Sequence, residues 1–469
     1  MTLSRRAITL LLCAATAYAW DVPAGTVWEA RLVTGISSFT MRKGAPVEAI
    51  LLAVPWGGAT APGGARLLGR IEEVHRVGFG LRRGRATIRP VFDTLLFRDG
   101  ETVPVSTTLI ELDNARETVD AKGQIQGIRA TSVFGHRIAG IARNIFCWDP
   151  LIQTVLAGTT SATLRFPESE IYLPAGSEFK VRIEKPVDLR DDLTVPLPQI
   201  AAGSEAEQLG AIVSALTLTT VDAKSGNAAD LVNILLLGES EWLERAFQAA
   251  GWVEADALSK ATAWKSFRAV AEAHKYPEAP MSGQLLDERP PEYQLSKTIN
   301  NFSQRHHARV FGQQAEFRGR PVHAGSATHD IAIDFLFTRF KLTHLVDTNV
   351  DRERAKVVND LVATGCVDAA ELIDRPWAPR EHINTSDQKL RTDGRIAVLE
   401  LNPCRTPLRQ VKLEQVPKPS AWRRIPRQFF LTLRNDFTYN NPVYQAGLGV
   451  KYLWRKMANR SAIRRSPSL

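Results

Sequence analysis

A motif of one turn followed by one strand occurs twice in the first part of the chain and constrains how that part can fold. The two copies read VPAGTVWEARL at 22–32 and LPAGSEFKVRI at 173–183. In each, Pro and Gly form a turn, and polar and apolar residues then alternate as in a half-buried strand. Because the copies bracket the region between them, we expect its first and last strands to pair.

Residues 21–187 are predicted to be an all-β domain, a barrel or a sandwich. Arg85 to Phe97 and Thr102 to Leu112 read as strands on either side of Asp99-Gly100, a strong hairpin signal. Gly and Pro separate the other strand-like runs, as a small barrel or sandwich requires. Residues 134–160 interrupt this pattern with a predicted helical excursion.

The same region resembles the C-terminal β-barrel of TrbI-type channel subunits of type IV secretion. The resemblance implies a barrel fold. It does not carry a channel function over, since the sequence shows neither the membrane helix nor the Pro-rich stalk that precede such barrels. The residues that carry it are VPAGTVWEARLVTGISS at 22–38, FDTLLFRDGETVPVS at 92–106 and SEIYLPAGSEFKVRIEKPVDL at 169–189.

A second domain with both helices and strands is predicted to follow a linker at 188–229 that contains one short helix. Alternation of strands and helices favours an α/β or α+β fold, so the whole chain is predicted to be an α+β multidomain protein. The second domain is expected to span 230–376, and 377–469 to form an extension with a basic, aromatic tail. The expected elements of the second domain are strands at 231–237, 305–311 and 331–337 and helices at 239–251 and 351–364, and a further strand is expected at 395–401 in the extension.

Residues 230–376 closely resemble the LssY C-terminal domain family. The family takes its name from a protein assigned to type I secretion, and the resemblance implies no established reaction. His323 departs from the pattern, in which a Trp is usual, so we leave it out of the predicted site. The matching segments are VNILLLGESEWLERAFQAAGW at 232–252, YPEAPMSG at 276–283, QRHHARVF at 304–311, GRPVHAGSATHDIAID at 319–334 and THLVDTNVDRERAKVVNDLVATGCV at 343–367.

Residues 1–19 are predicted to be a signal peptide. Arg5 and Arg6 form its positive region, an apolar run follows, and Ala17-Tyr18-Ala19 is an A-x-A cleavage site. The mature protein is therefore expected to begin at Trp20. No later apolar run approaches the roughly 20 residues of a membrane helix, so we expect a protein of the periplasm or the membrane-associated cell envelope.

The formal net charge of +9 favours anionic partners. We expect an anionic membrane surface or envelope component, with a role in protein assembly also open, and no specific nucleic acid. The tail has two interpretations, a partly ordered solvated segment or a segment that docks on an anionic surface. Its basic and aromatic residues are Trp422, Arg423, Arg424, Arg427, Phe429, Phe430, Trp454, Arg455 and Lys456.

Three cysteines follow the signal peptide, so at least one thiol stays unpaired. They are Cys147, Cys366 and Cys404. In an oxidising compartment Cys366 and Cys404 can form a disulfide, but the interpretation we favour is buried free thiols. The chain has no CxxC motif, which argues against a zinc site of thiolates.

The stretch from Arg305 to Arg354 combines imidazoles and carboxylates more densely than any other and is the predicted site. Five of the nine histidines lie in it. Its candidate ligand-binding residues are Arg305, His306, His307, Arg309, Asp330, His344, Asp347, Asp351 and Glu353. In a strand His306 and His307 point to opposite faces, whereas Arg305 and Arg309 share the face of His307. Asp351 can also be a helix N-cap, with Arg354 on the surface.

Three interpretations of this cluster remain. In the first, His307, Asp330, His344 and Asp347 bind a metal that activates water. In the second, the arginines and histidines bind an anion. In the third, which we favour, the cluster is a buried polar network. The spacing matches no motif such as HExxH, and Ser326 is not in G-x-S-x-G. The predicted function is binding or assembly, the alternative is a metal-dependent phosphoester hydrolase, and no cofactor is specified.

Overall fold

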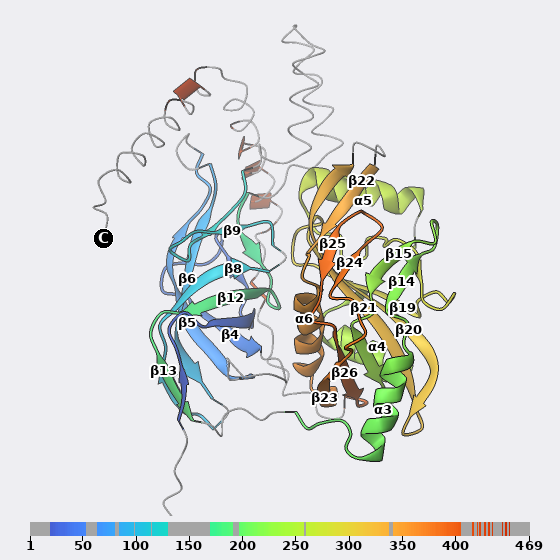
Figure 1. Ribbon diagram of the computed structural model, residues 1–469. Coiled ribbons are helices and arrows are strands. Elements are labelled where there is room, and N and C mark those ends of the chain that lie inside the picture. The colour runs from blue at the N-terminus through green and yellow to red at the C-terminus, as the bar shows by residue number, and fades with distance from the viewer. Residues whose placement is uncertain are drawn as a thin grey trace, which may run out of the picture.

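The computed structural model describes two domains that lie side by side (Figure 1). The described residues are 19–52, 63–79, 84–97, 99–113, 115–129, 169–190, 197–257, 259–336 and 341–404, with some positions between 415 and 450. The predicted signal peptide before Ala19, the helical excursion at 134–160 and Cys147 lie outside them.

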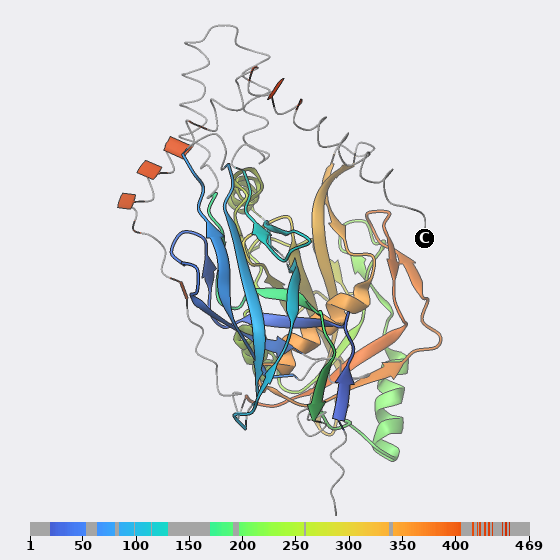
Figure 2. The same ribbon diagram turned by 90° about the vertical axis from the view of Figure 1, so that its left-hand side faces the viewer.

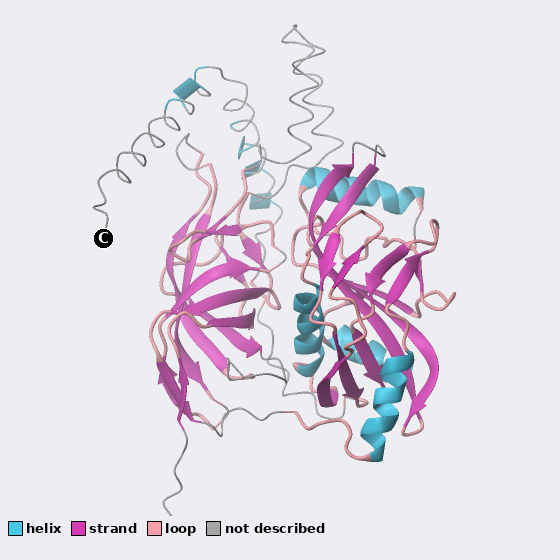
Figure 3. Ribbon diagram, in the orientation of Figure 1, coloured by secondary structure: helices cyan, strands magenta, loops and turns pink. Residues whose placement is uncertain are grey.

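The first domain is one antiparallel sheet that curls into a nearly closed barrel. Across the described residues from 19 to 190, strands are the only regular structure (Figure 3). At the two ends of the strand order, β9 lies beside β8. In order, the strands are β8 (Thr107–Leu112), β12 (Glu178–Ile183), β2 (Val27–Leu32), β4 (Pro46–Leu52), β5 (Arg66–His75), β6 (Thr87–Leu96), β10 (Ile125–Gln126) and β9 (Thr118–Val119), and β7 (Thr102–Pro104) pairs with β6.

The repeated turn and strand motif forms the pair that we expected. β2 and β12 lie antiparallel, with Trp28 opposite Val181. Their alternate side chains enter the barrel, where Trp28 and Phe179 are buried and the Phe179 ring stacks on Phe92 with 5.1 Å between centroids. Two short strand pairs form separate sheets beside it: β1 (Ala19–Val22) with β13 (Val187–Arg190), and β3 (Ile36–Ser37) with β11 (Tyr172–Leu173).

Two glycines shape the long strands of this sheet, which cross the shorter ones as the sheet curls (Figure 2). The predicted Asp99-Gly100 turn joins β6 to β7, and Gly100 has φ 91°, which favours glycine. At Gly69 the pairing of β5 with β6 shifts register, and a Cβ there would lie 2.1 Å from the Val91 carbonyl oxygen. Only a glycine permits this close backbone approach.

The second domain has a mixed sheet rather than a doubly wound parallel one. Among its described strands, β16 and β26 are the parallel neighbours, and the other pairs are antiparallel. The chain is thus an α+β multidomain protein, as predicted. In order, the strands are β17 (Val253–Glu254), β19 (Tyr293–Lys297), β20 (Arg305–Phe317), β21 (Arg320–Leu336), β16 (Ile234–Leu237), β26 (Arg395–Leu401) and β23 (Val367–Asp374), and β22 (Lys341–Val346) pairs with β21.

Helices cover both faces of this sheet. α4 (Ser240–Ala249) and α6 (Val350–Val362) pack on the face of Ile234 and Leu236. The helix α3 (Ser204–Ala215), in the segment expected to be a linker, packs on the face of Leu235 and Leu237. The remaining elements are α5 (Lys260–Glu272), a sheet of β15 (Ala228–Leu231), β14 (Thr219–Asp222) and β18 (Gln284–Leu285), and the pair β24 (Glu381–Ile383) and β25 (Lys389–Arg391). The predicted helix at 239–251 is confirmed as α4, and Gly251 follows it with φ 82°.

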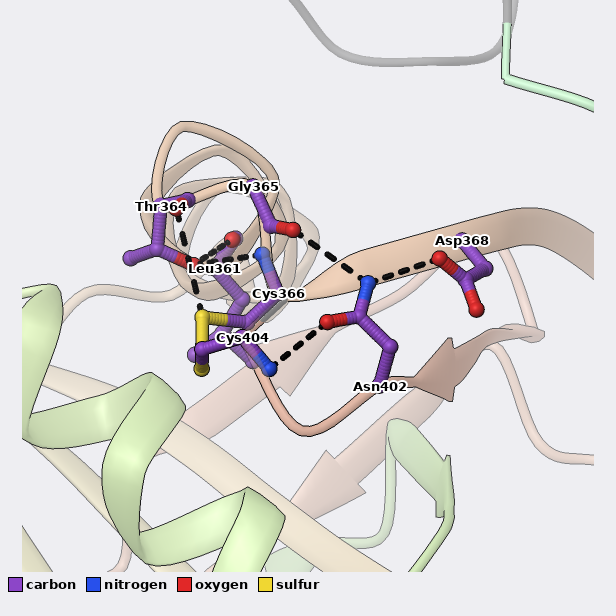
Figure 4. Close-up of a disulfide and its surroundings, with 7 residues drawn as sticks. All are labelled: Leu361, Thr364, Gly365, Cys366, Asp368, Asn402 and Cys404. Atoms are coloured by element: carbon purple, nitrogen blue, oxygen red, sulfur yellow. Dashed lines mark hydrogen bonds between the residues drawn. A yellow bond between two sulfur atoms is a disulfide. The ribbon is translucent and has the colours of Figure 1, made fainter. Parts of the chain in front are cut away.

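Cys366 and Cys404 form a disulfide, so our preference for free thiols at these positions is wrong (Figure 4). Cys366 follows α6, and Cys404 follows β26. Asn402 brings the two segments together, since its side chain donates to the Gly365 carbonyl and accepts from the Cys404 amide, at 3.2 and 2.7 Å. This local pairing places the two sulfurs within bonding distance.

The described helices give no candidate for a membrane span, because none is both long enough and apolar enough.

Helix α6 lies on the side of the second domain that faces the first (Figure 1). Three of its charged side chains, Glu353, Lys356 and Asp360, are buried, and this contact shapes the site.

Candidate functional site

Strand β20 separates the predicted site into two clusters. His306 and His307 point to opposite faces of the sheet, as expected for neighbours in a strand. The face of His307 also carries Arg305 and Arg309. The face of His306 points toward α6 and the first domain. We call these the Arg–His cluster and the junction cluster.

The charged groups of the Arg–His cluster contact protein partners, although His307 Nδ1, Arg305 Nε and Arg309 Nε have no hydrogen-bond partner among the described residues. His307 Nε2 lies 2.7 Å and His344 Nδ1 2.9 Å from the same oxygen of Asp330. Arg309 binds Asp230 at 2.8 Å and the Ser282 hydroxyl. Burial lowers the pKa of His307 to about 4, against the attraction of Asp330, so this imidazole is neutral near pH 7.

Arg305 completes that cluster by donating to the Ala279 carbonyl at 3.2 Å, with its guanidinium over the Phe302 ring. Both arginines are thus held by protein groups, and neither offers a free fork to a phosphate. The arrangement favours a buried polar network over the anion clamp.

Asp347 and Asp351 lie away from Asp330 and have other partners. Asp347 accepts from the Asn349 amide at 2.9 Å, and Asn349, not Asp351, caps α6. The carboxylate of Asp351 accepts from the Thr392 hydroxyl at 2.8 Å. The interpretation of Arg354 as a surface residue is also wrong, because its side chain is 4% exposed and binds Asp393 with two nitrogens.

The junction cluster is built around His306. Its Nδ1 lies 2.8 Å from Glu353 in α6, and its Nε2 lies 3.0 Å from Asp113 in the first domain. Burial alone would lower the pKa of His306, but the two carboxylates raise it to about 10. An imidazolium with two acceptors therefore joins the domains.

His329 stacks on His306 with 4.3 Å between ring centroids and 25° between planes. Burial and the neighbouring His306 lower the pKa of His329 to about 3, so its ring is neutral. In the part of the chain that the structure describes, one set of three His, Cys, Asp or Glu residues has ligand atoms within 4.8 Å of one another. It consists of Asp113, His306 and His329.

A pocket of about 190 Å³ opens beside this cluster, between the two domains. Carboxylates predominate in its wall, which gives it a local preference for cations. Its titratable lining residues are Glu29, Glu111, Asp113, Glu178, Lys180, His306, His329, Asp347, Arg352, Glu353 and Lys356.

Next to the pocket, a buried ion network holds the two domains together. Asp360 in α6 accepts from Arg31 of β2, from Lys297 and Lys356, and from the Trp252 indole. Glu178 of β12 binds the same three cations, with Lys356 at 2.6 Å. Burial alone would raise the pKa of Glu178, but Lys297, Lys356 and Arg31 hold it well below its usual range.

Sequence reasoning missed the residues that complete the junction. Asp113 follows β8 and Glu178 begins β12, both in the first domain, and no sequence spacing links them to His306. His329 belongs to the predicted stretch but was not chosen, although strand alternation places it on the face opposite Asp330. That alternation was the one signal that could have found it.

If the Arg–His cluster is a structural network, Asp330→Ala should lower the free energy of unfolding by roughly 1–3 kcal/mol, because His307 and His344 lose their acceptor. Chemical denaturation of the purified variant measures this. Asp374→Ala, at an aspartate whose side chain is 81% exposed, is the matched control and should melt as the parent does. An Asp330→Ala variant that loses bound metal while keeping full stability would instead favour the metal interpretation.

A family comparison agrees with the resemblance seen in the second domain. No curated protein matches the chain. Among solved structures, ComB10 of the Com type IV secretion system of Helicobacter pylori is similar at 13% identity, over 37% of this chain and 94% of that chain, with a TM-score of 0.20. Likeness at that TM-score supports no inference about function. Residues 213–396, which hold most of the second domain, match the model of the LssY C-terminus family.

Proposed function

We propose that this protein is an exported component of the cell envelope with a binding or assembly role at the membrane or in secretion. The observation that carries the proposal is the internal pairing of the Arg–His cluster. Arg305, His307, Arg309 and Asp330 are each at most 5% exposed and bind one another or their own domain. Groups that are held in this way stabilise a fold rather than turn over a substrate.

Charge supports an anionic partner. The chain has a net charge of +9, and its predicted signal peptide directs it toward the envelope. In the tail, Trp422 is 90% exposed beside the exposed Arg423. An exposed indole next to cations suits the boundary between lipid headgroups and acyl chains.

Arg427 does not belong to this exposed group. It binds Glu170 at 2.6 Å, donates to the Val77 carbonyl, and lies over the rings of Phe39 and Phe79. Its role is therefore to hold the tail on the first domain. Arg427 should therefore not be replaced in a test of membrane binding.

The double variant Arg423→Gln, Arg424→Gln should bind anionic vesicles more weakly than the parent. Each cation near a charged surface contributes about 1 kcal/mol, so the loss of two is expected to weaken binding by about 30-fold. Sedimentation with vesicles of phosphatidylglycerol and phosphatidylcholine, at low and at moderate salt, measures this.

The matched control removes two exposed arginines elsewhere, in Arg245→Gln, Arg391→Gln, and should bind almost as the parent does. Vesicles of phosphatidylcholine alone should bind little of either protein. Equal binding of all variants, or binding that salt does not weaken, would rule out docking of the tail on an anionic surface.

The second candidate is a metal-dependent hydrolase of phosphoesters. The four metal ligands suggested by the sequence give the hydrolase no support, since Asp347 does not lie with His307, Asp330 and His344. What favours it is the convergence of Asp113, His306 and His329 beside a pocket. Any such reaction would therefore take place at the junction of the domains and not in the Arg–His cluster.

A further inference from the structure

We propose that Asp113, His306 and His329 bind one divalent transition-metal ion at the junction of the two domains. Two of the residues come from adjacent strands of the second domain, and the third follows β8 of the first. Their ligand atoms lie within 4.8 Å of one another, and His306 Nε2 is 3.0 Å from Asp113. This inference goes beyond the binding role and does not depend on it.

The donor set selects the class of ion. Two imidazoles and one carboxylate suit Zn²⁺, Co²⁺ or Fe²⁺, whereas Mg²⁺ and Ca²⁺ prefer oxygen ligands. Three protein ligands leave a further position for a water or a substrate. All three residues line the pocket of about 190 Å³, from which a water or a substrate would reach the ion.

Glu353 supplies the support that metal-binding histidines usually have. Its carboxylate lies 2.8 Å from His306 Nδ1, which sets the Nδ1–H tautomer and directs Nε2 toward Asp113. A metal ion would take the place of the proton that Nε2 shares with Asp113. Glu353 is 3% exposed, so it is held in this orientation by the packing of α6 against β20.

An independent observation comes from His329. Its Nε2 is buried and has no hydrogen-bond partner among the described residues. In a complete polar network a buried ring nitrogen would be paired. His329 contributes one ring nitrogen to the set that it forms with Asp113 and His306. Because its ring stacks on that of His306, binding requires one of the two rings to turn until both lone pairs point at the ion. His307 Nδ1 in the Arg–His cluster is also unpaired, so the nitrogen of His329 supports the proposal through its place beside Asp113 and His306.

The position of the site implies what the ion would do. Because Asp113 and the two histidines come from different domains, one bound ion would connect the two sheets beside the network of Asp360 and Glu178. Its binding energy would add to the stability of the assembled pair of domains. The ion would also place a positive charge in a pocket whose wall is acidic.

The test uses the full chain after treatment with a chelator. Titration calorimetry with Zn²⁺ should show one ion per chain, and Co²⁺ should give visible absorption bands of a site with nitrogen ligands. His329→Gln and Asp113→Asn should each weaken Zn²⁺ binding by at least 100-fold. Glu353→Gln, which removes the orienting carboxylate, should weaken it by 10- to 100-fold.

His344→Gln is the matched control, since it removes an imidazole from the Arg–His cluster and should leave Zn²⁺ affinity unchanged. Zn²⁺ should raise the melting temperature of the parent and not that of His329→Gln, which loses no hydrogen bond at Nε2. If His329→Gln fails to fold, Asp113→Asn gives the same comparison. Absence of stoichiometric Zn²⁺ and Co²⁺ binding, or parental affinity in both His329→Gln and Asp113→Asn, would overturn the proposal.

Discussion

Replacing Asp360 with alanine should lower the free energy of unfolding by about 3–5 kcal/mol, because the change strands buried cations. Arg31, Lys297 and Lys356 all bind this carboxylate, whose side chain is 0% exposed. After the replacement, Glu178 alone would face the three cations. Loss of the Trp252 hydrogen bond adds to the effect.

The charge balance of the network explains why the stability of the protein depends on Asp360. Three cations already meet two carboxylates there, and burial together with Arg31 lowers the pKa of Lys297 to about 8. Removing one carboxylate increases an existing excess of positive charge among side chains that are at most 14% exposed. Since the network joins β2 and β12 to α6, we expect the two domains to unfold in separate transitions in the variant.

Guanidinium denaturation followed by circular dichroism measures the change. The control is Glu241→Ala, which breaks an exposed pair with Arg245 in α4 and should cost less than about 1 kcal/mol. Equal stability of Asp360→Ala and Glu241→Ala would show that the contact between the domains does not stabilise the protein.

Loss of the disulfide should lower the free energy of unfolding by a similar amount. The double variant Cys366→Ser, Cys404→Ser should be less stable than the oxidised parent by about 4 kcal/mol, because the bond closes a loop and restricts the unfolded chain. The two cysteines are separated by 38 positions. Thermal or denaturant melts of the two proteins under oxidising conditions measure the difference.

Reduction supplies the control. A reductant should lower the melting temperature of the parent toward that of the double variant and leave the double variant unchanged. Cys147 is present in both proteins, so its thiol does not distinguish them. A parent whose stability is insensitive to the reductant, with two free thiols at 366 and 404 by mass spectrometry, would contradict the pairing.

Local patterns in the sequence determined most of the secondary structure. The repeated motif predicted that β2 and β12 pair, and Asp99-Gly100 predicted the turn between β6 and β7. Apolar spacing predicted α4, and strand alternation placed His306 and His307 on opposite faces. These features depend on residues close together in the chain, whose geometry is set by backbone conformation.

Tertiary structure decided which charged groups are buried and what they meet. Lys356 and Asp360 are four residues apart on a helix, a spacing typical of an exposed ion pair, yet the first domain covers both. Arg354 was likewise expected on the helix surface, yet its side chain is 4% exposed and pairs with Asp393. His306 has a carboxylate partner in Asp113, which is 193 positions away in the chain. The sequence by itself determined the elements and their faces, whereas packing of one domain on the other determined the site, because burial and charge pairing depend on neighbours that are distant in the chain.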